Sequence, residues 1–187
     1  MISEHQHIPL LAFLLCMATV FTTAGDVKPD KLWDRQCSAQ RKWQIELAKL
    51  LTSTAPQLKE LIEIQRDLQL LSLDIRDVKY NYLLRNDPGR ITCARDPSEW
   101  INFPWSEEDD TRLRVSSPEY AKLEVAKQAL HERNQGHASW PELRKLFSTR
   151  VQESEEYQAL RKALQEELAQ IAHVLRERQE DNTAKTP

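Results

Sequence analysis

The feature that most constrains this chain is a long helical segment, residues 55–85, with apolar residues on two opposite sides. One side is a heptad seam, in which apolar residues alternate at spacings of three and four: Leu61, Ile64, Leu68, Leu71, Ile75, Val78 and Tyr82. Because a helix turns by about 100° per residue, a weaker stripe falls almost opposite the first: Ile62, Leu70, Leu73, Tyr80 and Leu84. Both sides must be covered. We therefore expect the central helix of a bundle, with a homodimer through this helix as the alternative.

The composition favours an all-α fold. The chain has only 3 glycines in 187 residues, and its charged fraction of 29% is typical of long helices with one wet face. A first helix is expected over residues 29–53, and Pro56 then suits the first turn of the next helix. Turn residues at 86–89 end that second helix. We predict a helical bundle, residues 25–178, built on a long antiparallel hairpin of these two helices with shorter helices packed against it.

Three further helices are predicted in the C-terminal part of the chain. Ser117 caps a helix that Gly136 ends, and Ser139 opens a short one with the pattern of a capping box. A long last helix over residues 154–178 places its apolar residues on one face. The polar residues 179–187 are expected to form a disordered tail.

The first residues determine the expected compartment. Residues 8–21 form an uncharged apolar run that is shorter than the roughly 20 residues needed to span a bilayer, and small residues lead to Ala24. This pattern predicts a signal peptide over residues 1–24, although the residues before the apolar run include no Lys or Arg. We expect an exported protein, periplasmic if the source is a Gram-negative bacterium and secreted otherwise, without a transmembrane span after cleavage. An uncleaved N-terminal anchor is the alternative.

Removal of the signal peptide would leave two cysteines, Cys37 and Cys93. An even number of cysteines in an exported chain is most simply a disulfide. The residues after 86 can span the distance back to Cys37 if they run extended along the helical hairpin. We therefore predict one disulfide, between Cys37 and Cys93.

Charge and motifs argue against several classes of function. The 26 basic and 29 acidic side chains are intermingled, so there is no basic footprint for nucleic acid. No phosphate-binding, dinucleotide or zinc-protease motif occurs, and His131, His137 and His173 lack the spacing of a metal site. The acidic run 107–110 is interpreted as the solvated first turn of a helix capped by Ser106. We expect no catalytic residues, no cofactor and no metal.

Three aromatic residues in one short segment are the best candidates for a binding site. Trp100, Phe103 and Trp105 are predicted to anchor a protein partner, because Trp is enriched at the energetic centres of interfaces. The alternative is that they cap the end of the bundle and fix the chain near Cys93. We predict an exported, non-enzymatic protein that mediates protein–protein interaction. The other functions considered are a carrier of an apolar small molecule within the bundle and, third, a helical enzyme.

Overall fold

The structure is a computed structural model, and it describes residues 30–93 and 101–184. The predicted signal peptide and Trp100 lie outside these residues. The described chain forms six α-helices, α1 Asp30–Thr54, α2 Lys59–Asn86, α3 Glu107–Ser116, α4 Pro118–Gln135, α5 Trp140–Leu146 and α6 Glu155–Ala184. They are joined by two 3₁₀ turns, η2 Pro56–Leu58 and η3 Pro88–Arg90, a π-helical turn η4 Phe147–Val151, and a ribbon of β1 Thr92–Cys93 and β2 Ile101–Asn102. The predicted all-α class is confirmed. None of the described helices combines the length and apolar character needed to cross a membrane.

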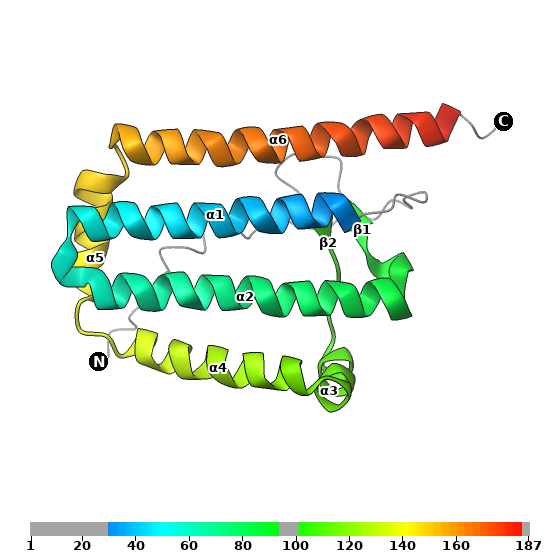
Figure 1. Cartoon of the computed structure of the whole chain (residues 1–187), viewed down its shortest axis with the longest axis horizontal. Coiled ribbons are helices and arrows are strands. Elements are labelled where there is room, and N and C mark those ends of the chain that lie inside the picture. The colour runs from blue at the N-terminus through cyan, green and yellow to red at the C-terminus, as the bar shows by residue number, and fades with distance from the viewer. Residues whose placement is uncertain (1–29, 94–100, 185–187) are drawn as a thin grey trace, which may run out of the picture.

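The four long helices lie side by side in a row, in the order α6, α1, α2, α4, and each runs opposite to its neighbour (Figure 1). The main helix contacts follow the same order, α6 with α1, α1 with α2, and α2 with α4. The predicted hairpin of α1 and α2 is therefore the centre of an open layer, with α4 and α6 at opposite edges.

The last helix is long, as expected, but its predicted end is wrong. The helix α6 spans 30 residues, against 25 in α1 and 28 in α2. It continues past residue 178, where the sequence analysis ended it, to Ala184. The physical reason is that no Gly or Pro interrupts this stretch, so each further residue adds a backbone hydrogen bond to an existing helix.

Both apolar sides of α2 are covered within the same chain. On one side Tyr80 belongs to a buried cluster with Trp33 of α1. On the other side Ile75, from the heptad seam, packs with Leu113 of α3 and Tyr120 of α4. The helix is thus an inner member of the row, as its two apolar stripes predict.

The helix α5 closes the end of the row at which α1 passes into α2 (Figure 1). Leu143 of α5 packs in a buried cluster with Leu58 and Leu61. The predicted helix start after Ser139 is confirmed, but the capping box there is wrong, because the Ser139 side chain makes no capping hydrogen bond. Its backbone, at φ −83° and ψ 6°, lacks the extended conformation of a capping residue, and its N–H donates to His137 Nδ1 at 3.2 Å.

The ribbon brings the chain that follows α2 back towards α1. Its residues pair in antiparallel register, Thr92 with Asn102 and Cys93 with Ile101. The residues immediately outside the ribbon, Ile91 and Phe103, both pack against the buried cluster that contains Cys37. The extended segment therefore folds back along the hairpin.

The predicted disulfide between Cys37 and Cys93 is not found. Cys37 is a buried, free thiol that packs as a small apolar residue with Trp33 and Tyr80. Burial, with a smaller contribution from the nearby Asp77, raises the pKa of this thiol to about 11, which makes it a poor nucleophile at neutral pH. The side chain of Cys93 lies outside the described residues.

Candidate functional site

Among the described residues, the two ion pairs with the least exposed side chains, Lys79–Asp110 and Arg90–Asp109, lie at one place, which we call the α3 corner. It consists of Lys79 from α2, Arg90 from η3, residues 104–116, and Tyr120 and Glu124 from α4. One of these residues is Trp105, which the sequence analysis predicted to bind a partner. The α3 corner therefore combines paired charges with a predicted binding residue, and it is the candidate functional site.

The helix α3 begins with a complete capping box. The Ser106 hydroxyl accepts from the Asp109 N–H at 3.1 Å, and the Asp109 carboxylate accepts from the Ser106 N–H at 3.0 Å. The predicted cap at Ser106 is thus confirmed, and carboxylates in the first turn are favoured by the helix dipole.

The predicted solvation of this acidic turn is wrong for two of its four residues. Asp109 is buried at 7% exposure, and the Asp110 side chain is only 22% exposed. Because Asp109 and Asp110 lie four and three residues before the buried Leu113, helical geometry turns them towards the same inner side. Glu107 and Glu108 face outwards and are exposed, as predicted.

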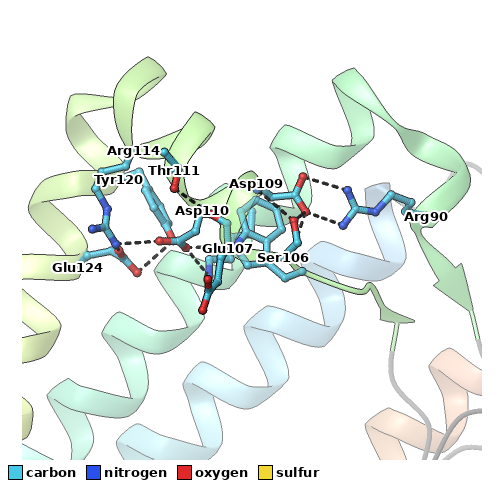
Figure 2. Close-up of polar contacts among 11 residues, drawn as sticks. Arg90, Ser106, Glu107, Asp109, Asp110, Thr111, Arg114, Tyr120 and Glu124 are labelled. Carbon is cyan, nitrogen blue, oxygen red and sulfur yellow. Dashed lines mark hydrogen bonds and ion pairs between the residues drawn. The ribbon is translucent and has the colours of Figure 1, made fainter.

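Asp109, in the first turn of α3, pairs with Arg90, which follows α2, so the two ends of the connecting segment are held together. Arg90 donates to both carboxylate oxygens, at 3.0 and 2.6 Å (Figure 2). It also donates to the Pro104 carbonyl at 2.7 Å. The guanidinium, with a further hydrogen bond from Ser106, holds the pKa of Asp109 well below its usual range despite burial. This bidentate pair closes the loop that contains the ribbon.

Asp110 joins three helices at one carboxylate. It accepts hydrogen bonds from the Tyr120 hydroxyl, from Trp105 Nε1 at 3.1 Å and from Arg114 at 2.8 Å, and it pairs with Lys79 at 3.2 Å. Burial raises the pKa of Asp110, but the hydrogen bonds from Tyr120, Trp105 and Lys79 outweigh it and leave the pKa at about 2. Burial and the two acceptors Asp110 and Glu124 raise the pKa of the Tyr120 hydroxyl far above its usual range. The carboxylate is thus ionised, and the phenol neutral, at neutral pH.

The structure places two of the three predicted aromatic residues against the core. Phe103 is half-buried, with ring-centroid distances of 6.0 Å to Trp33 and 6.3 Å to Tyr80, and Arg76 lies 5.9 Å from its ring. It therefore fixes the ribbon to the α1–α2 hairpin, which was the packing alternative in the sequence analysis.

Trp105 is also half-buried, but it lies at the rim of the α3 corner. Its ring lies 5.8 Å from Tyr82, and the Lys79 ammonium lies 4.8 Å from its centroid. Together with the hydrogen bond to Asp110, these contacts fix the indole ring in one orientation. Whether Phe103 and Trp105 also bind a partner remains a prediction.

An open pocket of about 510 Å³ lies beside Trp105. Its lining consists of residues from the start and the outer side of α3: Trp105, Ser106, Glu107, Asp110, Thr111, Arg114 and Val115. Val115 is 83% exposed, which is unusual for a large apolar side chain, while Leu113 of the same helix is fully inside. The pocket therefore has one aromatic wall, one exposed aliphatic residue and a charged rim.

No metal centre is found among the described residues, where no group of three or more potential ligands comes together. The three histidines considered in the sequence analysis have separate neighbours, His131 with Gln135 at 2.7 Å, His137 with the Ser139 N–H at 3.2 Å, and His173 with Glu177 at 3.4 Å. His131 and His173 are exposed and His137 is half-buried, each with its own neighbour.

The residues that the sequence analysis missed are the partners of the two aspartates: Lys79, Arg90 and Tyr120. Arg90 lies 19 residues before Asp109, and Lys79 lies on α2. Tyr120 is only ten residues after Asp110, but it belongs to a separate helix, so no single helical spacing connects these residues to the aspartates. One feature of the sequence indicates that the two aspartates turn inwards. Asp109 and Asp110 lie four and three residues before the apolar Leu113, so they are on the same side of the helix.

Comparisons with known proteins add no family. No protein-family model matches the chain, and no match is found among curated proteins or among solved structures.

Proposed function

We propose that this is an exported, non-enzymatic protein and that the α3 corner is the surface it offers to a protein partner. The observation that carries the proposal is Trp105, whose ring is held by Asp110 and Lys79 while it forms a wall of an open pocket. A rigid aromatic ring beside accessible apolar surface is the usual composition of an interface centre, because little side-chain freedom is lost on binding.

The charges of the corner support binding rather than catalysis. A general acid or base works best with a pKa near the operating pH, whereas the pKa of Asp110 is held at about 2 and that of Asp109 also lies well below its usual range. Both carboxylates are already engaged by cations. The contacts of Asp110 with Lys79 and Tyr120 hold α3 against α2 and α4, and this packing fixes the residues that line the pocket.

The pocket also suits a peptide better than an apolar small molecule. Carriers of apolar molecules enclose most of the ligand surface with apolar side chains. Here the pocket is open, and Glu107, Asp110 and Arg114 contribute to its lining. A protein partner can bury Trp105 and Val115 while its own polar groups meet this charged rim.

Site-specific photo-crosslinking tests the proposal. A photo-reactive phenylalanine derivative replaces Val115, at the pocket, or Val125 on α4, which is 72% exposed and does not line the pocket. We expect one defined adduct with another protein from position 115 in the native host, and none from position 125. Equal adducts from both positions, or none from position 115, would contradict the proposal.

Export and the disulfide belong to the same proposal, and one measurement addresses both. We propose cleavage after Ala24 and formation of a Cys37–Cys93 bond by thiol–disulfide exchange, in which the two cysteine thiols are oxidised while the disulfide of an oxidoreductase in the exported compartment is reduced to two thiols and takes up their protons. The supporting observation is that Ile91 and Phe103, which flank the ribbon containing Cys93, both pack on the cluster that contains Cys37. Intact mass of the exported protein gives the cleavage site, and alkylation before and after reduction counts free thiols. Two free thiols in the exported chain would exclude the bond.

A further inference from the structure

We infer that the pocket beside Trp105 binds a peptide segment in which an apolar side chain is next to an arginine or a lysine. This inference rests on the proposed function and adds the chemistry of the partner. It follows from three properties of the pocket: its apolar surface, the charge that remains without a partner, and the rigidity of its wall.

The apolar surface comes from Trp105 and Val115. Val115 lies two residues after the buried Leu113, so a helix turn of about 200° directs it away from the core. It is 83% exposed and lines the same pocket as the half-buried indole of Trp105. An aliphatic side chain placed between the two removes apolar surface from water on both sides.

The charge left over at the rim is negative. Asp110 is neutralised by Lys79 and Arg114, and Arg114 in turn pairs with both Asp110 and Glu124. Glu107 lines the pocket as well, and among the described contacts its carboxylate has no cationic partner. A basic residue of the incoming segment therefore complements the pocket, whereas an acidic one is repelled.

The third property is that the pocket is formed before a ligand arrives. The indole ring is fixed by its hydrogen bond to Asp110 at 3.1 Å and by the Lys79 ammonium. The Ser106 capping box fixes the backbone at the start of α3, where Glu107 is the first helical residue. Binding of a short segment therefore loses little conformational entropy on the protein side.

Short synthetic peptides test the inference with the full exported chain. Three acetylated and amidated peptides are compared: leucine flanked by arginines, leucine flanked by glutamates, and alanine flanked by arginines. Backbone amide chemical shifts of the protein give both the position of binding and the dissociation constant. We expect saturable shifts concentrated at residues 105–115 for the first peptide, and binding at least about tenfold weaker for each of the other two.

Matched variants on exposed positions separate binding from folding. Val115→Asp should weaken the leucine–arginine peptide by about tenfold, whereas Val125→Asp should leave it unchanged. Glu107→Gln should weaken it by about threefold, whereas Glu108→Gln, outside the pocket and paired with Arg112 at 2.5 Å, should not. All four positions are exposed, so the fold is retained.

The inference is overturned if the glutamate peptide binds as well as the arginine peptide, if the shifts map elsewhere, or if no peptide gives saturable shifts. Equal effects of Glu107→Gln and Glu108→Gln also overturn it. If the peptides fail but position 115 still crosslinks a partner protein, the proposed function stands and only the chemistry assigned to the partner is wrong.

Discussion

On the α1 side of α2, Trp33 stacks on Tyr80 with ring centroids 4.1 Å apart, and both rings are fully buried. On the α4 side, the hydroxyl of the buried Tyr120 instead hydrogen-bonds to the carboxylates of Asp110 and Glu124. Lys79 forms an ion pair with Asp110. The first contact is held by apolar burial and ring stacking, and the second by a charged network. Charged groups also contribute on the α1 side, where Trp33 Nε1 donates to the Asp77 carboxylate and Arg41 pairs with Asp74. Because the α4 side depends more on ionised groups, acid and salt should loosen that side of α2 before the other.

The largest expected effect is on the apolar side. Trp33→Ala removes the stacked ring and the Nε1 hydrogen bond to Asp77 at 2.7 Å, and should lower the free energy of unfolding by about 4 kcal/mol. Trp33→Phe keeps a stacked ring and should cost roughly half as much. Urea unfolding followed by circular dichroism measures both. Equal losses for the two variants would mean that the hydrogen bond, not the ring, holds this side.

Acid should act on the other side. The folded-state pKa values of Asp109 and Asp110 lie below those of the unfolded chain, so their stabilising contribution is complete above about pH 4 and is lost as pH falls. For Asp110 the loss should fall between about pH 4 and pH 2 and amount to roughly 2 kcal/mol.

Hydrogen exchange at a series of pH values, corrected for the intrinsic rates, locates this loss. The amides of α3 and α4 should lose protection at a higher pH than those of α1. In Asp110→Asn, which carries no titrating group at that position, the acid-dependent step should be smaller. Simultaneous loss of protection in α1 and α4 would argue against two separately stabilised sides.

A smaller effect is expected for a single hydroxyl. Tyr120→Phe removes the hydrogen bonds to Asp110 and Glu124 but keeps the ring, and should cost about 1 kcal/mol. It should also raise the pKa of Asp110, because one stabilising donor is gone. The control is Tyr82→Phe, since the Tyr82 hydroxyl has no hydrogen bond among the described contacts. Urea unfolding and carboxyl titration by NMR measure the two consequences, and equal stability of the two variants would count against the network.

The smallest effect is expected at the outer surface of the same helix. Arg112 pairs with Glu108 at 2.5 Å, but their side chains are 64% and 73% exposed. Arg112→Gln should therefore change the free energy of unfolding by less than about 0.5 kcal/mol, and less still at high salt. A loss of more than about 1 kcal/mol would show that exposed charges also contribute to this side.

Much of the fold could be predicted because it depends on local periodicity. The two stripes of α2 follow from residue spacing alone, and the start of α4 after Ser117 follows from a cap next to a proline. The order of the helices in the row could not be predicted, because local spacing does not say which neighbour each helix contacts, α6 packing on α1 and α4 on α2. Pairing is decided by contacts between residues that lie far apart in the chain.

The candidate site was predictable only in part, for the same reason. Trp105 and the cap at Ser106 are local features, and the sequence indicates both. The inward turn of Asp109 and Asp110 is stable only because Arg90 and Lys79 meet them, and a buried carboxylate without such a cation is costly. Without knowledge of these partners, an acidic run is most simply interpreted as a solvent-exposed helix turn.

The open row has a consequence for how the molecule loosens. A helix whose main contact is one neighbour can detach without dismantling the rest, as in repeat proteins, where stability is a sum over adjacent pairs. The helix α4 depends mainly on α2, and α6 mainly on α1. The two edges should therefore fray independently and transiently, while the α1–α2 pair between them persists as the last cooperative unit.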